Sequence, residues 1–136
     1  MKKIICFAFA LLMIVSAVGC SSSDRNVIDM TNYDERLTYL ELTKMVEDPK
    51  EYDGKKVMLR GMYMVVDNQI TGEKINACVV NDETACCSTY IEFELAEGVK
   101  MPEMNSKITI SGEFEATKQI SSYVGKLSNV TFLDQE

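Results

Sequence analysis

The sequence predicts a mainly β domain, a small closed barrel of five strands that follows one short helix. Three observations lead to this prediction. Apolar and polar residues alternate with a period of two through much of the chain after Gly54, as in strands with one buried face. A single stretch before Pro49 has the spacing of an amphipathic helix. Two strands contain an internal glycine, which favours a sheet coiled tightly enough to close on itself.

Residues 1–19 are expected to be a signal peptide. Lys2 and Lys3 precede an uncharged, mostly apolar run over residues 4–18, the pattern of an export leader. These fifteen residues would rise about 22 Å as a helix, less than the roughly 30 Å of a bilayer core, which disfavours a permanent span. The following Ala17-Val18-Gly19-Cys20 resembles a bacterial lipobox, whose cysteine receives a diacylglyceryl group. Ordinary cleavage after Gly19 is the alternative.

Lipid on Cys20 would anchor the protein to a cell membrane, outside the cytoplasm, without a spanning segment. Acyl chains contribute about 0.8 kcal/mol per buried CH₂, so two or more hold a protein at a membrane surface. Residues 20–27 would then be the lipidated cysteine and a flexible polar tether. Residues 28–136 are expected to form one domain, because a chain of this length rarely supports two cores.

The helix is predicted over Thr38–Asp48. Leu42, Met45 and Val46 fall at i, i+3 and i+4 and are expected to face the core, and Thr38 with Glu41 has the spacing of a capping box. Pro49 disfavours helical backbone at the residue before it, so the helix should stop there.

The five strands follow the helix. They are predicted over Val57 to Val65, Ile75 to Val80, Tyr90 to Leu95, Ile108 to Phe114, and Lys126 to Phe132. Gly61 and Gly112 occupy matching places in the first and fourth strands, each two residues before an aromatic residue. Glycine weakens a regular strand, so this repeat indicates bulges or sharp coiling where the sheet closes.

Two motifs carry a resemblance to a known family. Residues 49–55 have the pattern Pro-x-x-Tyr-x-Gly-Lys, and residues 85–87 read Ala-Cys-Cys. With these motifs the chain resembles small, functionally uncharacterised bacterial lipoproteins with an OB-like barrel. It is also similar to the OB-like C-terminal region of bacterial membrane proteins paired with permeases. The resemblance implies a five-stranded OB-like barrel, an extracytoplasmic setting and an envelope protein or permease as partner; it transfers no activity and no site residues.

The chemical state of three cysteines is the main question that the sequence raises about the domain. Cys6 leaves with the leader and Cys20 takes lipid, so Cys78, Cys86 and Cys87 remain. A hairpin between the second and third strands would bring Cys78 near the pair, and an oxidising compartment favours one disulfide and one free thiol. The alternatives are three buried reduced thiols, a soft-metal site of zinc type, or thiol redox chemistry.

A zinc-type site would use Cys78, Cys86 and Cys87, with an oxygen from Asp82 or Glu83 as a further ligand. The spacing is not that of a zinc knuckle, and the Cys-x-x-Cys redox motif is missing. The sequence therefore does not decide whether these residues bind a metal, and we expect no cofactor.

Composition narrows the class of function. The chain has no histidine and a net charge of −7, which becomes −9 when Lys2 and Lys3 leave with the leader. The lack of histidine removes imidazole-based triads and general bases, so we do not expect an enzyme. The negative charge disfavours nucleic acid, which needs a basic surface.

The remaining expectation is a binding or adaptor module for an envelope protein, peptide or small ligand. Tyr63, Tyr90 and Tyr123 are the candidate ligand face, because OB barrels use aromatic platforms to stack ligands. A concave surface on the first three strands is expected to hold the ligand.

Overall fold

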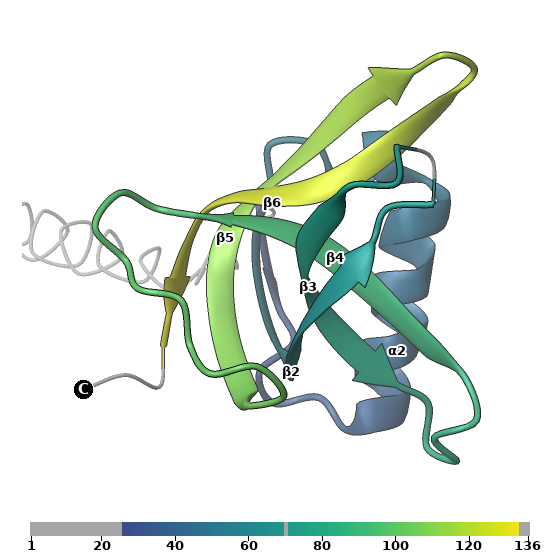
Figure 1. Cartoon of the computed structure of the whole chain (residues 1–136). Helices are drawn as coiled ribbons and strands as arrows, with labels where there is room; N and C mark the ends of the chain where they lie inside the picture. Colours follow the sequence, from purple (N-terminus) through teal and green to yellow (C-terminus); the bar gives the residue numbers. More distant parts are fainter. Residues whose placement is uncertain (1–25, 70, 134–136) are drawn as a thin grey trace, which may run out of the picture.

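Strands make up most of the folded part of the chain (Figure 1). The structure is a computed structural model that describes residues 26–69 and 71–133. The leader and Cys20 lie outside these described residues. The elements are β1 (Val27–Asp29), α2 (Glu35–Glu47), the 3-10 helix η1 (Pro49–Tyr52), β2 (Lys56–Asp67), β3 (Lys74–Asn81), β4 (Ser88–Leu95), β5 (Lys107–Gln119) and β6 (Ser122–Phe132).

Five of the strands close into a ring. The order is β2-β3-β4-β6-β5, and β5 pairs again with β2. Neighbouring strands are antiparallel except β4 and β6, which are parallel. Each of these strands contains one of the five segments predicted from alternation. A mainly β fold with one preceding α-helix is therefore confirmed.

The ring closes because β2 changes partner along its length. Its first half, Lys56 to Met62, pairs with β5, and its second half, Met62 to Asp67, pairs with β3. Gly61 lies at this change of partner. A β-carbon there would stand 2.5 Å from Cys78 Sγ and 2.7 Å from the Val79 carbonyl oxygen, so only glycine allows the strands to approach this closely.

The second internal glycine lies in a bulge. The register between β5 and β6 shifts between Ser111 and Glu113, on either side of Gly112. A β-carbon at Gly112 would stand 2.6 Å from Val130 Cγ2 and 2.9 Å from the Ser128 carbonyl oxygen. The interpretation of paired glycines as corners of a closing sheet thus agrees with where the strands bend.

The helix begins one turn earlier than the sequence predicts. Asp34 is the N-cap, and its side chain accepts a hydrogen bond of 2.7 Å from the Leu37 backbone N–H. The predicted capping role of Thr38 is therefore wrong: its hydroxyl donates to the Asp34 carbonyl oxygen at 2.9 Å, inside the helix. The helix ends at Glu47, before Pro49, as expected.

The chain enters the domain through a short strand that was not predicted. Val27, the last residue assigned to the tether, is the first residue of β1. This strand runs parallel to the start of β2, with Ile28 opposite Val57. Ile28 packs against the core, so the folded domain begins slightly before residue 28.

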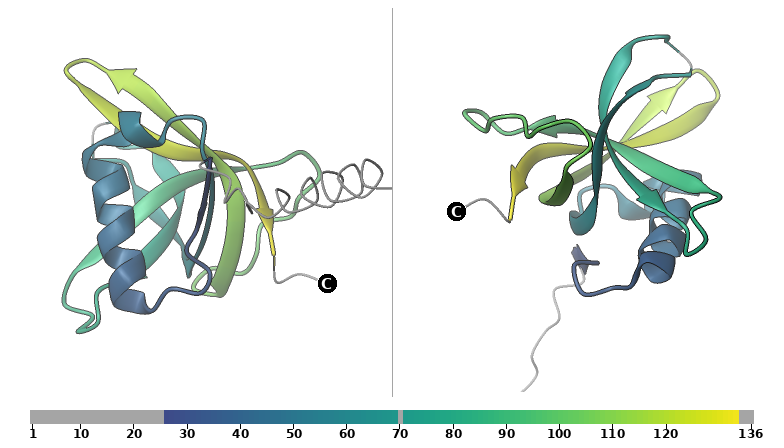
Figure 2. Two further views of the ribbon diagram at one scale, coloured as in Figure 1. Left: turned by 180° about the vertical axis from the view of Figure 1, so that it is seen from behind. Right: turned by 60° about the horizontal axis from the view of Figure 1, so that its bottom comes forward.

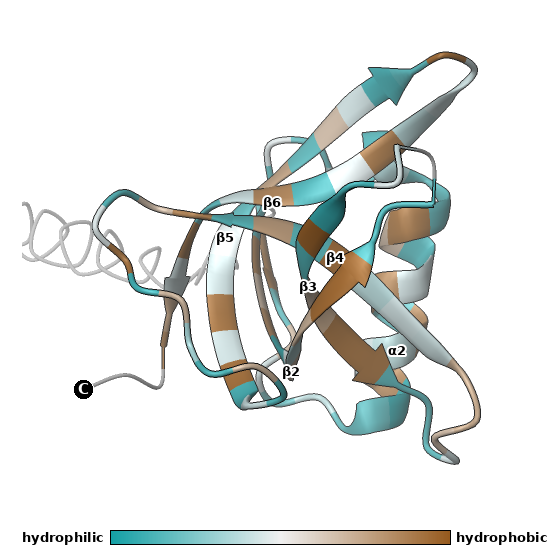
Figure 3. Ribbon diagram, viewed as in Figure 1, coloured by the Kyte–Doolittle hydropathy of each residue, from teal (hydrophilic) through white to brown (hydrophobic). Residues whose placement is uncertain are grey.

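One core fills the ring and extends under the helix. Figure 3 shows apolar bands along the paired strands β3 and β4, in the middle of the molecule. Helix α2 lies against these strands (Figure 2) and adds Leu42 and Met45 to the same cluster. The predicted core position of Val46 is wrong, because its side chain is 42% exposed. The largest fully buried side chains are Phe93, Phe114, Met30, Leu42, Met45, Leu59, Ile91, Ile110 and Leu127. Beyond this core, the hairpin of β5 and β6 projects away from the ring (Figure 2).

Candidate thiol loop and ligand groove

The loop between β3 and β4 carries both members of the cysteine pair. The last paired residues are Asn81 and Ser88, so the connection is residues 82–87. Asp82 N–H donates to the Cys87 carbonyl at 2.9 Å, and Ala85 N–H donates to the Asp82 carbonyl at 3.0 Å. Ala85 has φ of 54°, in the left-handed region that a residue with a β-carbon rarely adopts. The loop is thus a tight turn held by its own backbone.

Asp82 organises this loop through its carboxylate. Oδ1 accepts hydrogen bonds from the backbone N–H groups of Cys86, at 3.0 Å, and Cys87, at 3.3 Å. Oδ2 accepts from the Thr84 hydroxyl at 3.0 Å and from the Cys86 thiol at 3.4 Å. Partial desolvation raises the pKa of Asp82, but the hydrogen bonds from Cys87, Thr84 and Cys86 outweigh it, so the net pKa is lowered.

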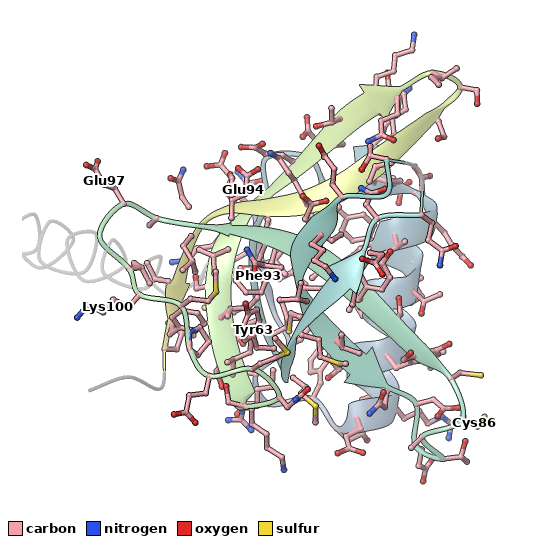
Figure 4. The ribbon with its side chains drawn as sticks, viewed as in Figure 1. Tyr63, Cys86, Phe93, Glu94, Glu97 and Lys100 are labelled. Atoms are coloured by element: carbon pink, nitrogen blue, oxygen red, sulfur yellow. The ribbon has the colours of Figure 1, made fainter. Side chains whose placement is uncertain are left out.

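The two thiols of the pair lie on the same side of the turn. Their Sγ atoms are 3.6 Å apart, and both side chains are exposed. The contact with the Cys86 thiol raises the pKa of Cys87. One oxygen of Asp82 and these two sulfurs all lie within 4.8 Å of one another. Figure 4 shows Cys86 at the tip of the loop, far from Tyr63 and Phe93 in the centre of the ring.

Cys78 does not join the pair. It lies on β3 between Tyr63 and Ile91, its partners on the neighbouring strands, and it is fully buried. Pairing of β3 with β4 continues for three residues beyond Cys78 before the loop begins, which separates it from Cys86 and Cys87. All three cysteines of the described chain are free. Burial raises the pKa of the Cys78 thiol to about 12.

This difference in burial predicts two classes of thiol reactivity. In the full chain carrying Cys6→Ser and Cys20→Ser, a chromogenic aromatic disulfide reagent should react with Cys86 and Cys87 in the native protein, because both side chains are exposed to the reagent. Cys78 should react only after denaturation. The measurement is the number of thiols consumed over time, with and without denaturant. Fast reaction of all three thiols in the native protein would contradict the buried position of Cys78.

A groove lies beside the thiol loop. Its volume is about 870 Å³, and it runs between the N-terminal end of α2 and the edge formed by β2, β3 and β5. Tyr33 and Thr38 line one side, and Arg60 and Lys107 line the other. Asp82 belongs to both the groove and the loop. The groove therefore combines cationic and anionic walls.

No family model, no curated protein and no solved structure matches the chain. In the part that the structure describes, no helix has the length and apolar character to cross a membrane.

The three candidate tyrosines do not form one face. Tyr63 points into the core, where its hydroxyl donates to Asn76 Oδ1 at 2.9 Å and its ring meets Phe93 at 5.9 Å. Tyr90 is exposed on β4, next to the buried Ile91. Tyr123 lies on the projecting hairpin, with Lys50 Nζ 4.2 Å from its ring centre. The alternation of strand faces could have separated these tyrosines. Tyr63 lies on the same face of its strand as the buried Leu59, whereas Tyr90 lies on the opposite face from the buried Ile91.

Proposed function

We propose that this protein is an extracytoplasmic lipoprotein, held on a membrane by lipid on Cys20, whose domain is a binding or adaptor module and not an enzyme. Its ligand is an envelope protein, a peptide or a small molecule. The groove at the end of α2 is the observation that supports this proposal best. Its volume of about 870 Å³ lies within the roughly 300–1,000 Å³ of ligand sites.

The strand order supports assigning the ring to the OB-like barrels. An OB-fold is a five-stranded, partly open Greek-key barrel that binds ligands on one face and its loops. In this chain β2 pairs with both β3 and β5, and β4 reaches β6 through a parallel contact. The groove uses β2 and β3, two of the three strands expected to present the concave surface.

The charges of the groove favour a ligand with both signs of charge. Arg60 and Lys107 are exposed on the sheet side, whereas Asp34, Glu35 and Asp82 lie on the helix and loop side. A peptide presents an amine, a carboxylate and backbone groups that match such a surface. The net charge of −7 for the whole chain disfavours a polyanion.

Site-specific crosslinking tests the groove in its native membrane. A photoreactive amino acid replaces Met62, which lines the groove, or Glu97, which is exposed on the loop between β4 and β5 (Figure 4). We expect a defined adduct from position 62, detected as a mass shift after irradiation, and none of the same mass from position 97. Identical products from both positions, or no adduct from position 62, would contradict a binding role for the groove.

The lipid anchor has its own test, with a matched control in the leader. Cys20→Ser should abolish incorporation of radioactive palmitate, because the thiol is the acceptor, whereas Cys6→Ser should leave it unchanged. Loss of acyl chains removes about 0.8 kcal/mol of membrane binding free energy per CH₂. In a detergent phase separation, a smaller fraction of the Cys20→Ser protein than of the wild-type protein should therefore enter the detergent-rich phase. An unlabelled wild-type protein, or label that survives Cys20→Ser, would disprove this anchor.

A further inference from the structure

The tip of the thiol loop places two sulfurs and one carboxylate oxygen around a common point. These atoms belong to Cys86, Cys87 and Asp82 and lie within 4.8 Å of one another. We propose that they form a three-ligand site for a thiophilic divalent cation of the zinc class, with a fourth position open to water or to a ligand. This site shares Asp82 with the groove, but it does not rest on the proposed binding role of the groove.

Two of the three separations between the ligand atoms are those expected around a tetrahedral ion. With metal–sulfur bonds of about 2.3 Å, a sulfur–sulfur distance of 3.6 Å corresponds to an angle of about 103° at the ion. With a metal–oxygen bond of about 2.0 Å, the 3.4 Å between Asp82 Oδ2 and Cys86 Sγ corresponds to about 104°. Both angles are close to the roughly 109° of a tetrahedron.

The loop geometry explains how adjacent cysteines can share one ion. Neighbouring residues on a strand point to opposite faces, but Cys86 and Cys87 follow the last residue of β3 and precede the first residue of β4. The turn at Ala85, with φ of 54°, redirects the chain before them. Both sulfurs can therefore point the same way, which the period-two rule does not allow within a sheet.

Hydrogen bonds orient the Asp82 carboxylate for binding an ion together with the two sulfurs. Asp82 Oδ1 is occupied by the N–H groups of Cys86 and Cys87, which leaves Oδ2 on the side of the sulfurs. The Thr84 hydroxyl donates to the same Oδ2 at 3.0 Å, as outer partners do for carboxylates that bind metals. Binding would replace the Cys86 thiol hydrogen bond by the ion, and each thiol would release one proton to solvent.

The ligand types select the class of ion. Thiolates bind zinc and similar soft or borderline cations in preference to Mg²⁺ or Ca²⁺, which take oxygen ligands. Cys78 is not a ligand, because it is buried on β3. Oxidation is the competing reaction: a Cys86–Cys87 disulfide would pass two electrons and two protons to an oxidant and remove both sulfur ligands.

Metal titration of the reduced full chain, carrying Cys6→Ser and Cys20→Ser, tests the site. Co²⁺ should bind with release of two protons and give a thiolate-to-metal charge-transfer band, and one equivalent of Zn²⁺ should displace the Co²⁺ and abolish the band without further proton release. Cys86→Ser or Cys87→Ser should lower Zn²⁺ affinity by more than about 100-fold, beyond the loss typical of an outer partner. Asp82→Asn should weaken Zn²⁺ binding about tenfold or more while keeping the band.

Two variants serve as matched controls. Cys78→Ala removes a thiol and Glu97→Gln removes an exposed carboxylate, and neither should change Zn²⁺ affinity. Circular dichroism checks that each variant is folded. The proposal is overturned if the reduced protein binds no Zn²⁺, if Cys86→Ser and Cys87→Ser bind it as tightly as the parent, or if protein trapped with alkylating agent in cells carries a Cys86–Cys87 disulfide.

Discussion

Phe93→Ala is expected to lower the free energy of unfolding by about 3–5 kcal/mol, the usual loss for a buried aromatic residue. Phe93 is 1% exposed on β4. Its ring centre lies 5.9 Å from that of Tyr63 on β2 and 6.5 Å from that of Phe132 on β6. One side chain therefore links three strands of the ring. Small domains have roughly 5–15 kcal/mol of stability in total, so this loss should strongly destabilise the fold.

The neighbouring residue supplies the control. Glu94 points outward and forms an exposed ion pair of 2.9 Å with Lys126, and such pairs contribute about 0–1 kcal/mol. Glu94→Ala should therefore change the unfolding free energy by less than about 1 kcal/mol. Both variants can be compared by urea unfolding followed with circular dichroism. Similar losses for the two variants would show that Phe93 is not a central packing residue.

The sequence predicts the strands well because their signal is local. Alternation marks β2 through β6, since each inward residue must be apolar to enter the core. The internal glycines also carry information, because closure of the ring brings Gly61 against the backbone of β3. Strand β1 has no such signal: its three residues become a strand only by pairing with β2, which is 27 residues or more further along the chain.

The candidate site was less predictable because it depends on contacts between distant residues. Cys86, Cys87 and Asp82 were recognisable by residue type, but the extent of pairing between β3 and β4 decides that Cys78 stands apart. The groove joins Thr38 of α2 with Lys107 of β5. No local pattern brings these two residues together, and they meet only when the ring has closed.

The closure of the ring can be tested at Gly61. An added β-carbon would lie 2.5 Å from Cys78 Sγ and 2.7 Å from the Val79 carbonyl oxygen. Gly61→Ala should therefore lower the free energy of unfolding by about 2–3 kcal/mol, near the upper end for overpacking. Combining it with Cys78→Ala removes one of the two obstacles. The double variant should lose less than the sum of the single losses, by about 1 kcal/mol.

A second glycine separates the effect of close packing from that of backbone conformation. Gly72 has φ of 74° but no atom within 4 Å of an added β-carbon, so Gly72→Ala should cost about 1–2 kcal/mol through conformation alone. It should show no coupling to Cys78→Ala in urea unfolding. Strictly additive losses for Gly61→Ala and Cys78→Ala would mean that β2 and β3 do not approach at this corner. In that case the change of partner along β2, and with it the groove lined by Gly61 and Val79, would not form.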